Sequence, residues 1–196
     1  MMSSTNLLKG IVTGIAGTLF ATAAWASDAH VAPMTEFAKS TVKQWVSDPA
    51  VVEAVKAQNA KHAGLGQADI DKMDKDWRAQ TDAGSKPMID AVLGNALSNY
   101  LRGKQDASQG LVTEVFVMDN RGLNVGQSDV TSDYWQGDEA KWQKTFQGGA
   151  DAVFVDEVEM DESTQTFQSQ LSMSIVDPAT GEVIGAITVG VNIDAL

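Results

Sequence analysis

Three large aromatic side chains fall within nine residues of one another and could form the wall of a binding site. They are Tyr134, Trp135 and Trp142. Flat rings stack on a ligand and exclude water, while a Tyr hydroxyl or a Trp N–H orients it. The alternative is that one or two of the rings only fill the edge of a sheet. We predict that at least two of the three line a site.

Charged residues flank this aromatic window. A carboxylate at Asp133 could hold an ammonium group of a ligand, which nearby rings would attract further by cation–π contact. Lys141 lies beside Trp142, where the two residues could close over one end of a pocket. Asp138 and Glu139 precede a short helix, and we favour helix capping for both, because carboxylates stabilise the positive end of a helix dipole.

The helix predicted for residues 67–81 carries one arginine and several aspartates. Arg78 could grip a ligand carboxylate with two hydrogen bonds. We favour the other interpretation, a salt bridge to a neighbouring helix, because most exposed helix arginines form no more than that. The aspartates at positions 69, 71, 74 and 76 lack the glycine of a calcium loop and are expected to form a solvated face. We therefore predict no metal site.

A polar face alternates with an apolar one between residues 167 and 176. The polar positions are Gln168, Gln170, Ser172 and Ser174; the apolar ones are Phe167, Leu171, Met173 and Ile175. This polar face either meets solvent or forms the floor of a ligand pocket, and both possibilities stay open. Gln168 and Gln170 are the better candidates for ligand contact. Phe116, Met118, Phe154 and Thr188 are predicted at adjacent strand positions.

The elements that must position these residues change type near residue 110. Apolar spacing predicts helices over residues 34–46, from 49 through 55, over 67–81, and over 89–101 with Gly103 ending the last. Five strands are predicted over 112–119, 123–128, 153–160, 167–176 and 183–191, with a loop and a short helix over 131–146. This order indicates an α+β fold: a PAS-like five-stranded antiparallel sheet with long N-terminal helices packed on one face.

Composition excludes several functions. The net charge of −12, without a cluster of Lys or Arg, argues against nucleic acid and anionic membrane surfaces as partners. The chain has no cysteine and two histidines, so thiol chemistry, iron–sulfur clusters and histidine-rich metal sites are excluded within one chain. Motifs for serine hydrolases, zinc proteases, phosphate-binding loops and dinucleotides are absent. We expect no catalysis and no cofactor.

The first 26 residues have the features of an export signal. Lys9 precedes an uncharged run over residues 10–26 that ends in Ala24-Trp25-Ala26, which is typical of a cleaved secretory signal peptide. An uncleaved membrane anchor is the alternative. Export without disulfides favours a bacterial periplasm. We expect a signal peptide over 1–26, a helical region over 27–110 and the sheet with its pocket over 111–196.

The stretches VFVMDNRGLNVGQSDVTSDYWQGDEAKWQKTF and DPATGEVIGAITVGVNI resemble the extracytoplasmic Cache sensor domains, and QNAKHAGLGQADIDKMDKDWRAQ is similar to the N-terminal helices of stand-alone single-Cache proteins. The resemblance implies small-ligand sensing in a pocket between the sheet and the loop-helix after the second strand. By position, that segment would contribute Asp133, Tyr134, Trp135, Lys141 and Trp142. The arginine-plus-aromatic signature of amino-acid-binding double-Cache sensors is not evident here.

We therefore expect a periplasmic, non-catalytic sensor that binds a small polar organic ligand. The resemblance implies a membrane histidine kinase, chemoreceptor or diguanylate cyclase as its partner, because the sequence has neither a second membrane span nor a signalling domain. It also implies that the long helices form a homodimer. Two rival interpretations are a solute scavenger without a signalling partner and a structural interaction module whose own side chains fill the pocket.

Overall fold

The computed structural model describes residues 29–161 and 166–196, so the predicted signal peptide lies outside the described residues. The helices are α1 (Val31–Phe37), the π-helical turn η1 (Ala38–Val42), α2 (Lys43–Val46), α3 (Pro49–His62), α4 (Gln67–Thr81), α5 (Pro87–Leu93), α6 (Ala96–Ala107), α7 (Ala140–Phe146) and the 3-10 turn η2 (Ile193–Ala195). The strands are β1 (Val112–Met118), β2 (Asn124–Gln127), β3 (Val153–Val155), β4 (Glu159–Asp161), β5 (Thr166–Val176) and β6 (Val183–Asn192).

All strand pairings are antiparallel, in the order β2-β1-β6-β5-β3, with β4 also paired to β5. The predicted α+β class and antiparallel sheet are therefore confirmed. The predicted third strand is two strands, because the chain leaves β5 after Val155 and pairs with it again from Glu159. The sheet accordingly has six strands rather than five.

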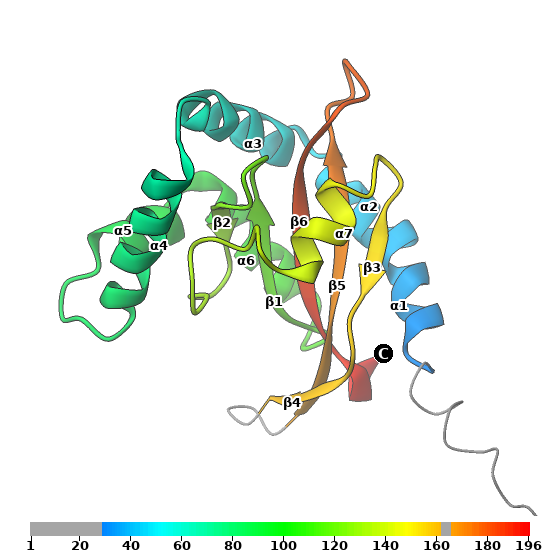
Figure 1. Cartoon of the computed structure of the whole chain (residues 1–196). Helices are drawn as coiled ribbons and strands as arrows, with labels where there is room; N and C mark the ends of the chain where they lie inside the picture. Colours follow the sequence, from blue (N-terminus) through cyan, green and yellow to red (C-terminus); the bar gives the residue numbers. More distant parts are fainter. Residues whose placement is uncertain (1–28, 162–165) are drawn as a thin grey trace, which may run out of the picture.

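Helices α1, α2, α3 and α6 pack on one face of the sheet, as the sequence predicts for the N-terminal helices, whereas α4 and α5 lie beside β2. Figure 1 shows α7 on the near face, with α1, α2 and α6 on the far face. One core joins the helices to that far face; its largest members include Met34, Trp45, Leu101, Leu171, Ile175 and Ile187. A second, smaller core lies among α4, α5 and the loop after β2, and contains Ile70, Trp77, Ile89, Leu123 and Tyr134.

The prediction of a single helix over residues 89–101 is wrong in two respects. It is interrupted after Leu93, where Asn95 begins a new helix by accepting a hydrogen bond from the backbone N–H of Ser98 at 2.8 Å. It also continues through Gly103 to Ala107. A single glycine costs an exposed helix only about 1 kcal/mol, so the helix passes through this position.

Candidate functional site

The second face of the sheet, opposite the main core, carries rows of polar side chains. Strand register aligns Phe116 with Thr188, Thr188 with Ser172, and Ser172 with Phe154. The next row aligns Glu114, Gly190 and Gln170. The predicted neighbours on adjacent strands therefore share one face of the sheet.

Helix α7 covers one half of this polar face. Ser174 donates through Oγ to the backbone oxygens of Thr145 and Gly149, at 2.9 and 2.7 Å, and is buried. Ser172 and Thr188 hydrogen bond to each other at 2.9 Å and are also buried. These hydroxyls hold the protein together, whereas Gln168 and Gln170 remain half-buried.

Two adjoining cavities of about 200 Å³ each lie over the other half of the face. The first is lined by residues that include Glu114, Phe116, Thr131, Asp133, Glu139, Lys141 and Gln170. The second is lined by Glu139, Lys141, Asp156, Glu157, Glu159, Gln168, Ser169 and Gln170. Since Glu139, Lys141 and Gln170 border both cavities, the two cavities form one candidate site, which we call the sheet-face site.

The floor of the sheet-face site is fixed by hydrogen bonds between strands. Gln170 donates through Nε2 to Oε1 of Glu114 at 2.8 Å, reaching across β6 at Gly190. A Cβ at Gly190 would stand 2.7 Å from Cγ of Glu114, so glycine leaves the space for this contact. Thr113 donates to Oε1 of Gln168 at 2.8 Å.

Lys141 stands between the two cavities with its charge neutralised. Its Nζ lies 2.8 Å from Oε2 of Glu139 and 5.5 Å from the centre of the Phe116 ring, and its side chain is 13% exposed. Glu139 is the residue before α7, but its side chain makes no capping hydrogen bond. The capping role predicted for Glu139 is therefore wrong, because its carboxylate pairs with Lys141 instead.

Asp133 lines the first cavity and also contacts α4. Its Oδ2 accepts from Nη2 of Arg78 at 3.0 Å, and Arg78 also donates through Nε to Asp74 at 2.7 Å. The hydrogen bond with Asp74 raises the pKa of Arg78 above its ordinary value. Arg78 thus forms salt bridges, as its sequence context favours, but within α4 and to the loop after β2 rather than to a neighbouring helix.

Asp74 departs from the predicted solvated face of α4. Its Oδ1 accepts from the backbone N–H groups of Tyr134 and Trp135, at 2.9 and 3.1 Å, and its side chain is 14% exposed. This aspartate is turned inward because it holds the loop that leads to the sheet-face site. Among the described residues, no cluster of three His, Asp or Glu side chains could hold a metal ion.

The three aromatic residues of the sequence window pack against the protein. Tyr134 stacks on Trp77 with ring centres 5.3 Å apart, and Trp135 donates through Nε1 to the backbone oxygen of Arg121. Trp142 stacks on Phe146 at 4.8 Å. Met118 is buried in the cluster that contains Trp142. These contacts occupy the aromatic side chains, and none of the three residues lines either cavity of the sheet-face site.

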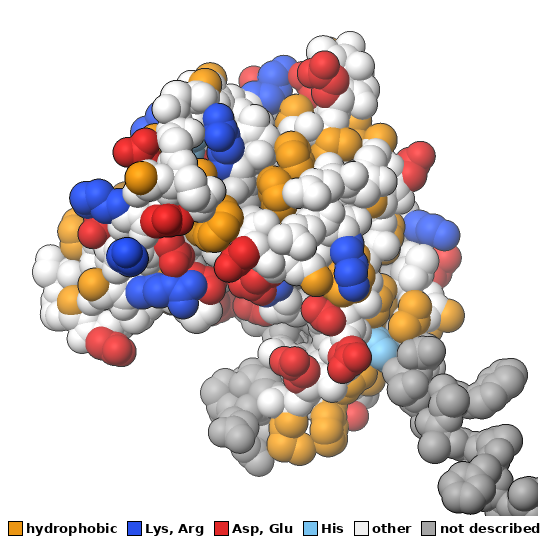
Figure 2. Space-filling view, in the orientation of Figure 1, with side chains coloured by type: hydrophobic (Ala, Val, Ile, Leu, Met, Phe, Trp, Pro, Cys, Tyr) orange, Lys and Arg blue, Asp and Glu red, His pale blue; other side chains and the backbone are white. Residues whose placement is uncertain are grey.

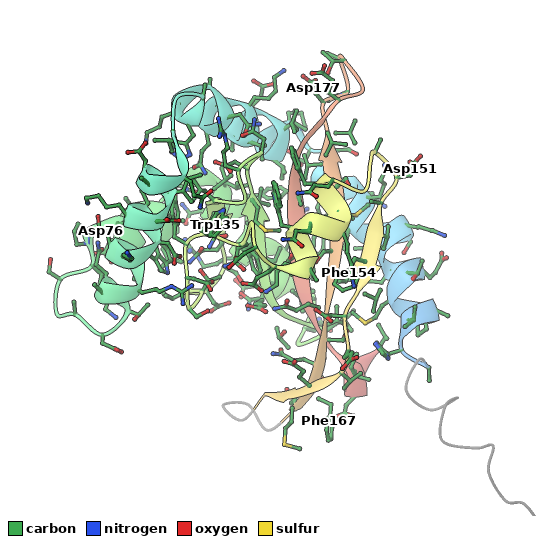
Figure 3. The ribbon with its side chains drawn as sticks, in the orientation of Figure 1. Asp76, Trp135, Asp151, Phe154, Phe167 and Asp177 are labelled. Atoms are coloured by element: carbon green, nitrogen blue, oxygen red, sulfur yellow. The ribbon has the colours of Figure 1, made fainter. Side chains whose placement is uncertain are left out.

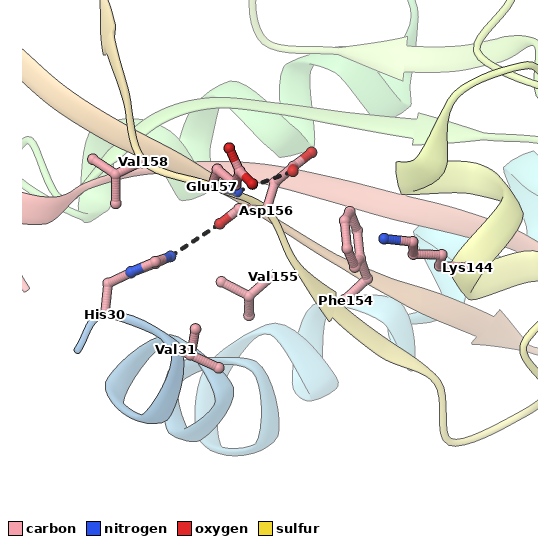
Figure 4. Close-up of a pocket in the computed structure, with 8 residues that line it drawn as sticks. All are labelled: His30, Val31, Lys144, Phe154, Val155, Asp156, Glu157 and Val158. Carbon is pink, nitrogen blue, oxygen red and sulfur yellow. Dashed lines mark hydrogen bonds between the residues drawn. The ribbon is translucent and has the colours of Figure 1, made fainter. Parts of the chain in front are cut away.

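Phe154 lines neither cavity of the sheet-face site. Figure 3 places it beside α7, whereas Trp135 lies on the side of the sheet nearer α4. Phe154 borders a third cavity of about 540 Å³, and Nζ of Lys144 lies 4.0 Å from the centre of its ring. Figure 4 shows Val31 and Val155 on the wall of this cavity and the hydrogen bond from His30 to the backbone oxygen of Asp156.

Sequence reasoning missed a buried polar cluster below the β1–β2 turn. Asp119 is fully buried and accepts hydrogen bonds from Gln58 and His62, at 3.0 and 2.9 Å. Trp142 donates through Nε1 to the backbone oxygen of Asp119 at 3.1 Å. The only local signal is the Asp119-Asn120-Arg121-Gly122 turn sequence, which predicts the turn but not the two helices that reach it.

Comparison with known proteins gives structural similarity without sequence similarity. No protein-family model and no curated protein matches the sequence. The V. cholerae histidine kinase DctB sensor domain has a TM-score of 0.37 at 15% identity, covering 74% of this chain and 57% of that one. The sensory domain of the Campylobacter jejuni chemoreceptor Tlp3 has a TM-score of 0.39 at 14% identity, with coverages of 82% and 58%.

The ligand-binding domain of the Pseudomonas fluorescens chemoreceptor CtaA, in complex with L-alanine, has a TM-score of 0.38 at 10% identity, with coverages of 86% and 60%. All three of these structures are sensor or ligand-binding domains. The chain spans a little over half the length of the first of them. Similarity at this level assigns neither ligand nor partner. Within residues 29–161 and 166–196, no helix is both long and apolar enough to cross a membrane.

Proposed function

We propose that this chain is an exported, non-catalytic sensor that binds a small polar molecule in the sheet-face site and passes its occupancy to a membrane signalling protein. The observation that carries the proposal is the difference between the two faces of the sheet. One face is apolar and packed under helices. The other presents half-buried amides and carboxylates to two adjoining cavities. Polar groups around a cavity fix the orientation of a ligand and give it specificity.

Export is supported by the first 26 residues, whose basic start, uncharged run and Ala-Trp-Ala end are typical of a signal peptide. A signalling partner in the membrane, a histidine kinase, chemoreceptor or diguanylate cyclase, follows from the resemblance of the sequence to extracytoplasmic sensors. The helices on the far face are the surface through which the chain would form a homodimer or meet that partner.

Hydrogen bonds made from α7, which borders the site, link that helix to the end of α3. Lys141 borders both cavities, and the next residue along α7, Trp142, bonds to the backbone oxygen of Asp119. The carboxylate of Asp119 bonds in turn to His62 at the end of α3. A ligand that binds one arrangement of these contacts more tightly than another would shift the population toward it.

The test is a thermal-shift screen of the purified protein with organic acids, amines, purines and amino acids. A ligand at one hundred times its Kd stabilises the folded state by about 2.7 kcal/mol, which raises Tm by several degrees. Gln170→Ala should reduce the shift, because Gln170 borders both cavities. Gln147→Ala is the matched control, since Gln147 is exposed at the end of α7.

The outcomes separate the rival functions. Absence of any stabilising compound would contradict ligand binding and favour a structural module. A shift that Gln170→Ala leaves unchanged would place binding outside the sheet-face site. A ligand-bound monomer that associates with no membrane receptor or kinase ectodomain, measured by sedimentation, would indicate a solute scavenger.

A further inference from the structure

The sheet-face site is strongly acidic. Glu114, Asp133 and Glu139 line the first cavity, and Asp156, Glu157 and Glu159 add three more carboxylates in the second. Among the described residues of the two linings Lys141 is the only basic one, and Arg78, outside the linings, pairs with Asp133. Figure 2 shows acidic side chains gathered on this face, beside and below α7. The net charge of the chain, −12, has the same sign, so the field of the whole protein repels anions and attracts cations.

Lys141 shows independently that a cation fits this place. Its ammonium group lies between the carboxylate of Glu139, at 2.8 Å, and the face of the Phe116 ring, at 5.5 Å. A carboxylate and a ring face together form a typical environment for an ammonium ion. Its flexible four-carbon stem can also carry the charge elsewhere.

We infer that the ligand of the sheet-face site is an organic cation, an amine with one or more ammonium groups, and that Lys141 is a built-in competitor which the ligand displaces from Glu139 and Phe116. This inference rests on the proposed function and deepens it. An anionic ligand would need Lys141 as its partner and would face six carboxylates along the two linings, of which Asp133 is paired with Arg78. The two classes of ligand therefore predict opposite effects of removing Lys141.

The test uses two probes with the same number of carbons and opposite charge, putrescine and succinate, titrated calorimetrically into the wild-type protein and Lys141→Met. Methionine keeps an unbranched apolar stem and removes the charge. Putrescine should bind the wild type, bind Lys141→Met about fivefold more tightly, and bind both more weakly as salt is added. Succinate should bind neither protein.

Two further variants control for general changes in charge. Lys144→Met removes the same charge from the same helix, but Lys144 lies over Phe154 beside the third cavity; its putrescine affinity should stay within about twofold of the wild type. Glu139→Gln in the Lys141→Met background should abolish the gain, because it removes the carboxylate that the amine is inferred to take over.

If succinate binds the wild type and Lys141→Met abolishes that binding, the inference of a cationic ligand is overturned, while the proposed sensor function stays intact. A failure of putrescine to bind either protein would also overturn this inference. The wider compound screen tests the proposed function separately, because a neutral or anionic compound whose shift depends on Gln170 would still support it.

Discussion

Nδ1 of His62 lies 2.9 Å from Oδ2 of Asp119, with the two side chains 5% and 0% exposed. The other oxygen of Asp119 accepts from the backbone N–H groups of Arg121 and Leu123, at 2.8 and 2.9 Å. One buried carboxylate thus joins the end of α3 to the β1–β2 turn. Removing a buried carboxylate with this many donors costs stability, because the donors lose their acceptor and water cannot replace it.

Asp119→Ala should lower the free energy of unfolding by about 3–5 kcal/mol, because it leaves His62 and the backbone N–H groups of Arg121 and Leu123 without their acceptor. The measurement is urea unfolding followed by circular dichroism. Asp151→Ala serves as the control, since Asp151 is exposed, and its effect should lie within about 0.5 kcal/mol. Equal effects of the two substitutions would show that the buried cluster adds no stability.

Both tyrosines of the chain should resist ionisation while it stays folded. Burial, followed by a hydrogen bond with Asp48, raises the pKa of Tyr100 to about 12. Burial also raises the pKa of Tyr134 above its ordinary value, and the negative charge of Asp119 adds to this effect.

A raised tyrosine pKa contributes stability that is fully present below about pH 10 and is lost as the pH rises toward the folded-state value. Tyrosinate absorbance should therefore be small in the folded protein at pH 10 and appear on unfolding in urea at that pH. Full ionisation of both tyrosines in the folded protein at pH 10 would contradict the buried position of Tyr134.

Asn95 accounts for the break between α5 and α6. Its Oδ1 accepts from the backbone N–H of Ser98, and its Nδ2 donates to the backbone oxygen of Val125 on β2, both at 2.8 Å. Asn95→Ala should cost about 1–2 kcal/mol in urea unfolding, the usual range for loss of an N-cap. Asn99→Ala, at an exposed position on the same helix, should cost clearly less. A similar cost for both would show that Asn95 does not set the start of α6.

Asn95 also illustrates where sequence reasoning fails on this chain. The apolar stripe from Ile89 to Leu101 has one helical period, so it predicts one helix. The cap bond that begins α6 comes from Ser98, but Asn95 is also held in place by its bond to Val125, thirty positions later, and no local pattern indicates that partner. By contrast, the alternation around Gln170 and Leu171 depends only on the strand period, and the two faces of β5 were predicted correctly.

The aromatic window shows the same limit at the candidate site. Spacing places Trp142 on a short helix next to Lys141, and the structure agrees. Whether its ring meets a ligand or the protein depends on the backbone oxygen of Asp119, twenty-three positions earlier. The sequence therefore predicts which segment covers the polar face, while three-dimensional contacts decide which side chains of that segment reach the cavities.

Gly122 brings the β1–β2 turn against the wall of the sheet-face site. Its φ is +81°, and a Cβ there would stand 2.6 Å from Cα of Gly137. Its backbone oxygen accepts from the N–H of Gln136, which lines the first cavity, at 2.7 Å. The turn and the cavity wall are therefore in direct backbone contact, and only glycine permits that approach.

Gly122→Ala should lower the free energy of unfolding by about 2–4 kcal/mol, combining backbone strain at positive φ with overpacking against Gly137. Gly181→Ala isolates the strain, since Gly181 has a φ of +76° and nothing within 4 Å of its would-be Cβ; it should cost only about 1–2 kcal/mol. If Gly122→Ala displaces the loop, it should also weaken binding of any ligand found in the thermal-shift screen, while Gly181→Ala should leave that affinity unchanged. Equal stability losses for the two variants would show that the loop yields to a methyl group, and the turn would then have no part in fixing the cavity wall.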